Sequence, residues 1–168
     1  QDKAGESQVI TAENIIIASG SVPATIPGWP TDKNFLCTSD EALHWKELPK
    51  RLVIIGGGVV GCEFACMMAE FGVDITIVEM MPGLLPEMEI GLGSALADIF
   101  KKRNIKIFTS VKVENLEVKE NAVKAVITGG QTIEADRVLV STGRRPNTKE
   151  LGLENIGIQT DRGFVRVN

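Results

Sequence analysis

The chain has 168 residues, a formal net charge of −4 and 43% hydrophobic residues. This length suits one domain, or one domain with an appendage, and the apolar content suffices for a core. An acidic balance excludes a basic surface for nucleic acid, and no apolar run reaches the ~18 residues of a membrane-spanning helix. The N-terminal residues do not resemble a signal peptide, so we expect a cytoplasmic location.

The first elements are predicted to be short. β-Branched residues in Gln8–Ile10 and Asn14–Ala18 predict two short strands. Ser39 is a suitable N-cap residue for a helix over Asp40–Lys46, and Pro49 ends that element. The central part of the sequence starts just after this proline.

Three glycines are spaced as Gly56-x-Gly58-x-x-Gly61, between a predicted strand at Leu52–Ile55 and a predicted helix at Val59–Phe71. This is the layout of a dinucleotide-binding turn. The first glycine permits the tight turn, the second lets a pyrophosphate approach the backbone, and the third lets helix and strand pack closely. The free N–H groups at the start of the helix then face the phosphates. The alternative is a tight strand-to-helix turn with no ligand.

A second strand is predicted at Val73–Val78, after Gly72 ends the helix, and Glu79 follows it 23 residues after Gly56. A carboxylate at this position can accept hydrogen bonds from the adenine ribose hydroxyls and repels the 2′-phosphate of NADP. No Lys or Arg occurs between Val73 and Phe100, so NAD is favoured over NADP. The alternative is a solvated glutamate at a strand end.

The remaining pattern predicts an α/β fold. A helix over Glu87–Arg103 and a strand at Ile105–Phe108 extend the strand–helix alternation. Residues 111–118 and 123–127 then alternate with period two, as antiparallel strands do, before Arg137–Ser141 returns as a core strand. We therefore predict a Rossmann-like parallel sheet with an inserted antiparallel β-meander.

The three cysteines are Cys37, Cys62 and Cys66, and the only histidine is His44. An odd number of cysteines without framework spacing argues against a disulfide scaffold, and one histidine gives little from which to build a metal site. Cys62 and Cys66 lie on one face of the predicted helix, where a redox or metal pair is one interpretation. Two small buried packing residues are the favoured one, and His44 is interpreted as a surface or packing residue.

Four segments, in order, resemble the flavin-dependent pyridine nucleotide–disulfide oxidoreductases, and most closely the dihydrolipoamide dehydrogenases among them: residues 16–23, 56–65, 75–79 and 141–147. The resemblance implies an NAD-binding domain at 41–150 within a larger FAD protein. Residues 1–40 would be a flavin-domain-like segment leading into it, and 151–168 a return segment. The sequence of that last segment predicts a hairpin at 158–167.

The resemblance also implies cofactor contacts. Gly56, Gly58 and Gly61 would hold the pyrophosphate of NAD, with Val59 and Val60 lining the turn. The positions of these five residues agree with the interpretation drawn above from spacing alone.

The resemblance assigns roles to four further residues, and for Glu79 it agrees with the role inferred above from its position. Glu79 would bind the adenine ribose, and Val113 would contact the adenine. Glu63 would lie near the nicotinamide, paired with a flavin-domain lysine, and Gly143 would lie beside the nicotinamide. An acid favoured near a helix N-terminus is the alternative for Glu63, and a plain turn glycine is the alternative for Gly143.

The sequence departs from the family where the chemistry occurs. The family's redox cysteines have four residues between them, whereas Cys62 and Cys66 have three. The FAD-binding glycine motif, a later flavin contact and the catalytic histidine have no counterpart here. We therefore expect no catalytic residue and no metal in this fragment. It would bind NAD(H) as a monomer without activity, whereas the parent, an expected homodimer, would pass electrons from dihydrolipoamide through a disulfide and FAD to NAD.

Other interpretations stay open. The chain could come from another family member, such as an NADH-dependent disulfide or metal-ion reductase or an NADH oxidase. A stand-alone nucleotide-binding or sensor module is a second possibility, and a structural module with a vestigial site is a third. In the favoured interpretation its partners are NAD(H) and the remainder of the flavoenzyme, with no nucleic acid and no membrane.

Overall fold

The computed structural model describes residues 9–29, 34–119 and 122–167. Contacts divide the chain into two compact units. The larger is Val22–Arg145, and the smaller combines Gln1–Ser21 with Pro146–Asn168. Within the described residues no helix has the length and apolar character needed to cross a membrane.

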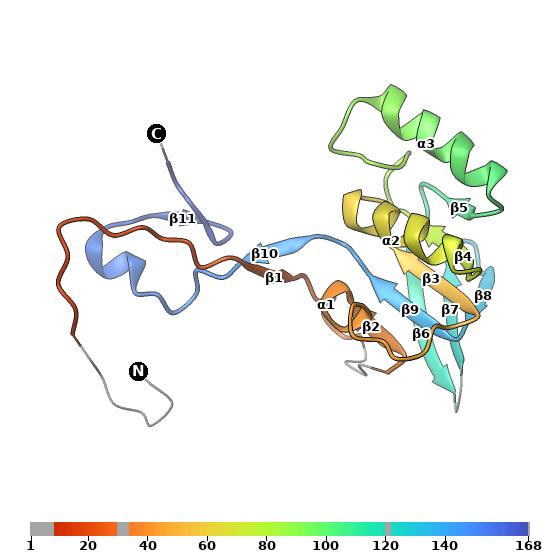
Figure 1. The fold of residues 1–168 in the computed structure, drawn as a ribbon, viewed down its shortest axis with the longest axis horizontal. Coiled ribbons are helices and arrows are strands. Elements are labelled where there is room, and N and C mark those ends of the chain that lie inside the picture. The colour runs from red at the N-terminus through yellow and green to blue at the C-terminus, as the bar shows by residue number, and fades with distance from the viewer. Residues whose placement is uncertain (1–8, 30–33, 120–121, 168) are drawn as a thin grey trace. The chain divides into compact units, whose positions relative to one another are not determined.

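A five-stranded parallel sheet forms the centre of the larger unit (Figure 1). Its strands, in spatial order, are β2 (Leu36–Thr38), β9 (Arg137–Val140), β3 (Arg51–Ile55), β4 (Asp74–Val78) and β5 (Lys106–Phe108). In the middle of the sheet, Ile54 pairs with Ile77 on one side and with Leu139 on the other. The predicted α/β fold with a parallel sheet is confirmed.

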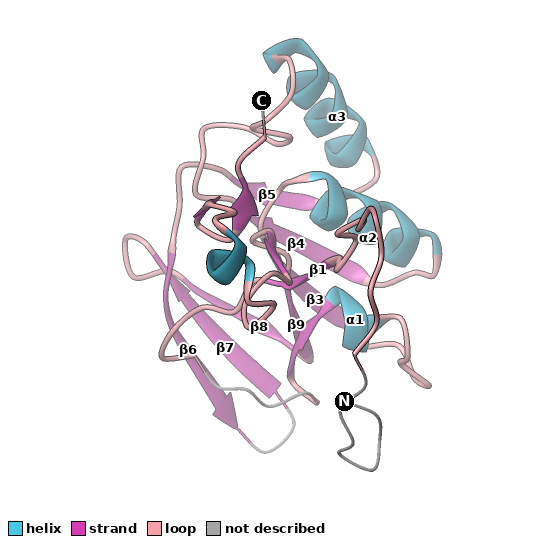
Figure 2. Cartoon of the chain, turned by 90° about the vertical axis from the view of Figure 1, so that its left-hand side faces the viewer, coloured by secondary structure: helices cyan, strands magenta, loops and turns pink. Residues whose placement is uncertain are grey.

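The inner residues of the strands are mostly apolar because both faces of the sheet are covered. Helices α1 (Ser39–Ala42), α2 (Val59–Glu70) and α3 (Ile90–Lys102) lie on one side, and the antiparallel strands lie on the other (Figure 2). Ile54 and its same-face neighbours pack with Phe64, Ala65 and Met68 of α2. The alternate residues of the strands, such as Val53, pack against the antiparallel strands instead.

The predicted meander is confirmed, and it has a third strand that the sequence did not predict. It consists of β6 (Val113–Lys119), β7 (Ala122–Ile127) and β8 (Thr132–Ala135), in that order. The sequence Glu120-Asn121 predicts a turn between β6 and β7, and these two residues lie outside the described residues. In β7, Val123, Ala125 and Ile127 are buried against the parallel sheet while their neighbours face away, which explains the period-two pattern.

A charged group joins the meander to the sheet. Arg51 of β3 contacts Asp136 at 2.8 Å between Nη2 and Oδ1, and Glu134 of β8 at 3.7 Å. The backbone N–H groups of Lys50 and Arg51 also donate to Asp136 Oδ2, at 3.0 and 2.9 Å. Partial burial alone would raise the pKa of Asp136, but the hydrogen bonds and charge of Arg51 outweigh it and hold this pKa below its ordinary value.

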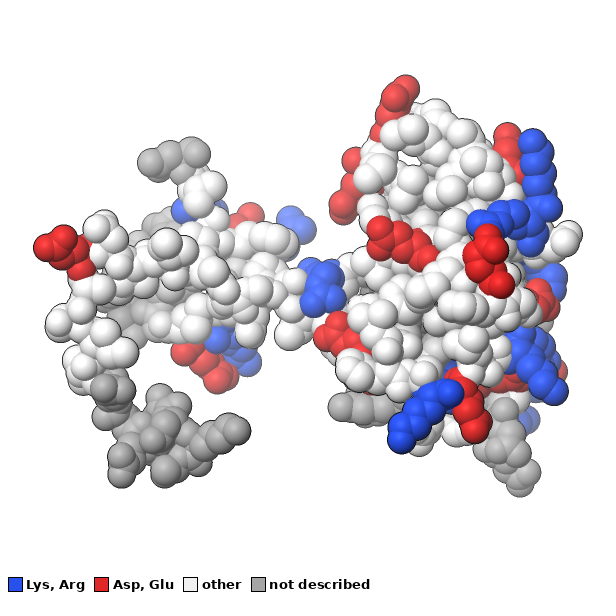
Figure 3. Space-filling model, in the orientation of Figure 1, with Lys and Arg blue, Asp and Glu red and all other residues white. Residues whose placement is uncertain are grey.

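Elsewhere on the larger unit, basic and acidic side chains are interspersed in small groups on the face shown in Figure 3. The ion pairs of the larger unit include Lys106–Asp74 and Lys124–Glu134, at 3.1 and 3.4 Å. Exposed pairs of this kind contribute little to stability.

Three predicted helix boundaries are wrong. The N-cap of α1 is Thr38 rather than Ser39, because the Glu41 carboxylate accepts hydrogen bonds from both the N–H and the hydroxyl of Thr38. This helix also ends at Ala42 rather than Lys46, since the N–H groups of His44 and Trp45 bond to carbonyl oxygens three residues back. Helix α3 starts at Ile90 rather than Glu87, because a turn closed by Met88 N–H and Leu85 O, at 2.9 Å, precedes it.

The C-terminal ends of α2 and α3, by contrast, agree with the sequence. Gly72 (φ +79°) follows α2, and Asn104 (φ +60°) follows α3. Both are in the left-handed conformation that terminates helices.

The smaller unit has little regular structure. It contains the 3₁₀ helix η1 (Leu153–Ile156) and the predicted C-terminal hairpin, formed by β11 (Thr160–Asp161) and β12 (Phe164–Val165). A two-stranded sheet of β1 (Ser21–Pro23) and β10 (Arg144–Pro146) spans the residues where the two units divide.

The strand predicted at Asn14–Ala18 is absent, and the one at Gln8–Ile10 is absent over its described residues, since Gln8 lies outside them. The side chains of Ile15 and Ile16 are exposed, and no neighbouring strand pairs with this segment within the described residues. β-Branched residues favour a strand only where a partner completes the hydrogen bonds.

Candidate functional site

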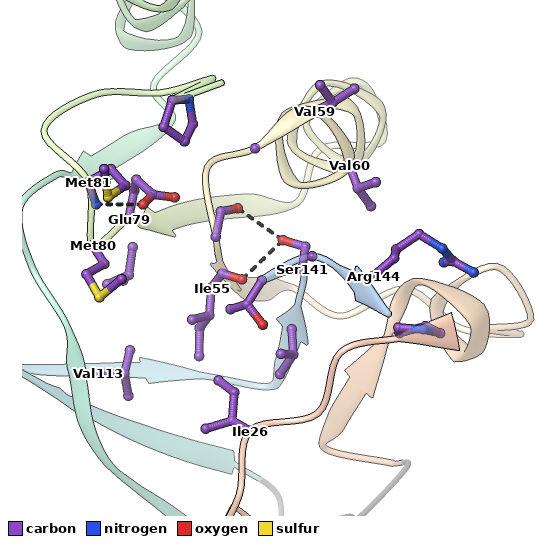
Figure 4. A pocket seen from close by; sticks show the side chains of 18 of the residues that line it. Ile26, Ile55, Val59, Val60, Glu79, Met80, Met81, Val113, Ser141 and Arg144 are labelled. Atoms are coloured by element: carbon purple, nitrogen blue, oxygen red, sulfur yellow. Dashed lines mark hydrogen bonds between the residues drawn. The ribbon is translucent and has the colours of Figure 1, made fainter. Parts of the chain in front are cut away.

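A pocket of about 750 Å³ opens at the carboxyl ends of β3, β4 and β9. The last residue of each strand and the residue after it line this pocket: Ile55, Gly56, Val78, Glu79, Val140 and Ser141. Ligands of open parallel sheets bind outside the carboxyl ends of the strands. The location therefore makes this pocket the candidate ligand site, and Figure 4 shows it from close by.

The three glycines after β3 have different geometries. Gly56 has φ +108°, and a Cβ there would lie 2.4 Å from the Ser141 carbonyl oxygen. A Cβ on Gly61 would lie 2.0 Å from the Gly56 carbonyl oxygen, so α2 approaches this turn closely. A Cβ on Gly58, which lines the pocket, would meet nothing within 4 Å. Two of the glycines are thus required by backbone contacts, while Gly58 leaves open space on the pocket side.

Ser141 holds this glycine turn, defined here as residues 56–58. Its hydroxyl donates to the carbonyl oxygens of Ile55, at 3.1 Å, and Gly56, at 3.0 Å (Figure 4). Its N–H donates to Ile55 O at 2.8 Å. Sequence reasoning missed this residue, because 85 residues separate it from Gly56 and no local pattern signals the contact.

The first turn of α2 lies beside the pocket. Gly58 is the N-cap, and Val59 and Val60 line the pocket after it. The first N–H groups of a helix have no partner within the helix and carry partial positive charge. Since no acidic residue lies in this first turn, that charge is available to an anion. Glu63 is exposed one turn further on and is not among the residues that line the pocket.

Glu79 is 6% exposed, which excludes the alternative of a solvated glutamate. Its Oε2 accepts a hydrogen bond from Gly57 N–H at 2.5 Å, and its Oε1 accepts one from Met81 N–H at 2.6 Å. A carboxylate has about four acceptor positions, so two remain for a ligand. The carboxylate also joins the glycine turn to the segment after β4, as does the bond from Leu85 N–H to Gly57 O at 2.8 Å.

The pocket wall beyond Glu79 is largely apolar. Met80, Met81 and Met88 line it, together with Val113 from β6. Figure 4 shows Met80 and Met81 beside Glu79, with Val113 on a neighbouring strand. Lys112 brings a positive charge to the same wall. The sequence did not predict Lys112 at the pocket, because this residue is far from Glu79 along the chain.

The other side of the pocket is formed by the segment after β9. Gly143 lines it with φ +119°, and its carbonyl oxygen accepts a hydrogen bond from Ala24 N–H at 2.9 Å. Arg144 follows, on the side opposite Met80 in Figure 4, and lies 3.5 Å from an oxygen of Asp40. Of the nine residues predicted to bind cofactor, seven thus line one pocket; Glu63 and Gly61 do not, and Gly61 instead packs against the Gly56 carbonyl oxygen.

The cysteines take no part in this pocket. Cys62 is buried, and its thiol donates to Gly57 O at 3.3 Å. Burial, together with the neighbouring Cys66 and two glutamates, raises the pKa of Cys62 to about 11, so the thiol is protonated and inert at neutral pH. Cys66 is only partly buried, with Arg103 Nη1 3.4 Å from its sulfur. Among the described residues no cluster of three metal-ligand side chains exists, and His44 is exposed as expected.

Comparisons with known proteins agree with this geometry. Residues 1–168 match the family described as pyridine nucleotide-disulphide oxidoreductase. A dihydrolipoyl dehydrogenase of Chlorobaculum tepidum is 40% identical over 168 residues, which are 98% of this chain and 36% of the relative. A dihydrolipoyl dehydrogenase of Bacillus subtilis is 36% identical, over 97% of this chain and 35% of its own length.

Solved structures similar to this chain include flavoprotein disulfide reductases. The HOCl-induced flavoprotein disulfide reductase RclA of Escherichia coli superposes with a TM-score of 0.78 at 32% identity, covering 89% of this chain and 35% of that one. LpdA of Mycobacterium tuberculosis gives a TM-score of 0.76 at 31% identity, over 86% of this chain and 32% of that one. The chain spans about a third of the length of the relatives it matches.

Proposed function

Since this chain belongs to the pyridine nucleotide–disulphide oxidoreductase family, we propose that its pocket is an NAD(H) site and that residues 41–150 are the NAD-binding domain. The observation that carries the proposal is the buried Glu79 carboxylate, 2.5 Å from Gly57 N–H at the edge of the glycine turn. A buried carboxylate beside a helix N-terminus is suited to a ligand that carries both hydroxyls and phosphates.

The residues present fit a dinucleotide. The open space over Gly58 and the N–H groups of the first turn of α2 would receive the pyrophosphate, with Gly56 and Gly61 shaping the turn. Glu79 would accept hydrogen bonds from the adenine ribose with its two remaining acceptor positions.

The two ends of the pocket would take the two bases. The apolar wall that includes Val113 would contact the adenine, and Gly143 would lie beside the nicotinamide. Glu63 lies outside the pocket lining, so its role would depend on the cofactor or on the rest of the parent enzyme. When bound, NAD supplies the hydride-accepting ring, and this chain supplies orientation and charge.

The proposal extends to the parent enzyme. It would be a dihydrolipoamide dehydrogenase-like flavoprotein, a homodimer, which oxidises a dithiol through a redox disulfide and FAD and passes hydride to NAD. Relatives named dihydrolipoyl dehydrogenase support this, at 36–40% identity. Residues 1–40 and 151–168 would belong with the flavin part. The 168-residue chain alone would bind NAD(H) and have no dehydrogenase activity.

A second candidate is another flavoprotein disulfide reductase of the same family. The 0.78 TM-score against a flavoprotein disulfide reductase supports it. The two candidates share the NAD(H) site and differ in the substrate of the parent. Assaying the parent with dihydrolipoamide and with other disulfide substrates separates them.

The NAD(H) site is tested by titrating the chain with NADH and following nicotinamide fluorescence. We expect saturable binding of one NADH per chain, which adenosine diphosphate ribose displaces because it carries the ribose and pyrophosphate contacts. The matched control is nicotinamide mononucleotide, which lacks the adenosine half and should bind much more weakly. Absence of NADH binding by the folded chain would overturn the proposal for this chain.

A further inference from the structure

Three of the five methionines of the chain line the pocket, and we call Met80, Met81 and Met88 the methionine wall. Their exposed fractions are 57%, 43% and 47%, so a small reagent in solution can reach each sulfur. The other two methionines lie on α2 outside the pocket lining. Met67 is 38% exposed, and Met68 is buried in the core.

The backbone holds the methionine wall in place. Met81 N–H donates to Glu79 Oε1 at 2.6 Å, and Met88 N–H donates to Leu85 O at 2.9 Å. Leu85 N–H in turn donates to Gly57 O at 2.8 Å. The backbone that carries these methionines is therefore held next to the glycine turn and the Glu79 carboxylate, where Figure 4 shows Met80 and Met81.

A thioether and its sulfoxide offer a ligand different surfaces. A thioether is apolar and polarisable, and it makes favourable contacts with aromatic rings. A sulfoxide is polar and needs hydrogen bonds, which the apolar side chains of the wall and the face of an adenine ring do not supply. Oxidation would thus change the wall beside the ribose-binding carboxylate without altering a charge.

We propose that the methionine wall is a peroxide-sensitive modification site, and that its oxidation to sulfoxide weakens NAD(H) binding reversibly. In the reaction, a sulfur lone pair forms an S–O bond to one peroxide oxygen while the O–O bond breaks. The other oxygen leaves as water after receiving the proton of the first. The sulfur is oxidised by two electrons and the peroxide is reduced. This inference rests on the proposed function of the pocket as an NAD(H) site.

The test treats the chain with hydrogen peroxide, maps sulfoxides by peptide mass spectrometry, and measures the NADH dissociation constant before and after. We expect faster oxidation of Met80, Met81 and Met88 than of Met68, slower oxidation of these three when NADH is present, and a dissociation constant raised about tenfold after oxidation. Methionine sulfoxide reductases should restore the original value.

The matched variants are the triple variant Met80→Leu, Met81→Leu, Met88→Leu and the single variant Met67→Leu. Leucine keeps the wall apolar and cannot be oxidised by peroxide. The NADH dissociation constant of the triple variant should be the same before and after peroxide, whatever its starting value, whereas Met67→Leu should lose affinity after peroxide as the unmodified sequence does. Circular dichroism confirms that each oxidised sample is still folded.

The outcomes separate the inference from the proposed function. If the untreated chain binds no NADH, the proposed function fails and the inference fails with it. If the untreated chain binds NADH and the oxidised chain binds it equally well, only the inference is overturned. Loss of affinity in the peroxide-treated triple variant would also overturn it, because the lesion would then lie elsewhere.

Discussion

Replacing Gly61 by alanine tests the close approach of α2 to the glycine turn. The new Cβ would lie 2.0 Å from Gly56 O and 2.8 Å from Ser141 Oγ. Real Cβ atoms essentially never come within 3.0 Å of another heavy atom, so the alanine lacks about 1 Å of room. The first obstacle is a backbone carbonyl, which cannot rotate away as a flexible side chain can.

Two opposing effects set the size of the stability change in Gly61→Ala. Alanine is better than glycine inside a helix by about 1 kcal/mol. Overpacking a tight site costs about 1–3 kcal/mol and occasionally more, and a backbone obstacle places Gly61→Ala at the upper end. The net loss is about 1–2 kcal/mol, which lowers the Tm by about 2–8 °C in a chain of this size.

The matched substitution is Gly58→Ser, three residues earlier. Gly58 has φ −74° and ψ −173°, and a Cβ there meets nothing within 4 Å. Serine is a preferred N-cap residue, so the stability should be unchanged or slightly higher. The side chain would fill the space proposed for the pyrophosphate. Loss of a hydrogen bond to a charged group, about 1.5–3 kcal/mol, would raise the NADH dissociation constant by roughly tenfold to a hundredfold.

The assay combines thermal unfolding by circular dichroism with NADH titration of both variants. Gly61→Ala should lose stability, while Gly58→Ser should keep its stability and lose affinity. Unchanged stability in Gly61→Ala would refute the close contact between α2 and the turn. Normal NADH binding by Gly58→Ser would refute the position of the phosphates.

Three further predictions concern stability, thiol reactivity and assembly. Asp136→Asn should lower the free energy of unfolding by about 1–2 kcal/mol at pH 7. Because the pKa of Asp136 in the folded state is depressed, this difference from the unmodified chain should disappear as the pH falls through that pKa. A difference that stays constant in urea unfolding from pH 7 to about pH 2 would contradict the pairing of Asp136 with Arg51. Cys62, with a pKa of about 11, should react with iodoacetamide at pH 8 far more slowly than in urea, as followed by mass spectrometry; equal rates would show that its thiol is accessible. The chain should sediment as a monomer, and a tight dimer would contradict this.

The sheet could be predicted because its strands are locally encoded. Leu52–Ile55 is apolar at consecutive positions and Val73–Val78 is mainly β-branched and apolar, as strands covered on both faces are, and the structure packs apolar residues on both sides of them. The strand at Asn14–Ala18 was wrong for a physical reason. Its β-branched residues favour an extended chain, but pairing depends on a neighbour that the segment's own sequence cannot reveal.

The candidate site also has parts that the sequence predicts and parts that it does not. The glycine turn and Glu79 lie within 23 residues and follow directly from spacing. Ser141 and Lys112 reach the pocket from distant strands, so their contribution depends on the sheet order β2-β9-β3-β4-β5 and on the meander. Such contacts become visible only once the topology is known.

The most direct test of the central claim is a pair of titrations, with NADH and with NADPH, on the unmodified chain and on Glu79→Gln. The account predicts that NADH binds the unmodified chain at least about tenfold more tightly than NADPH, because the buried carboxylate of Glu79 binds the ribose hydroxyls and repels a 2′-phosphate. In Glu79→Gln the preference should shrink. Equal affinity for the two nucleotides in the unmodified chain would contradict the assignment of Glu79 as the ribose-binding residue of an NAD site.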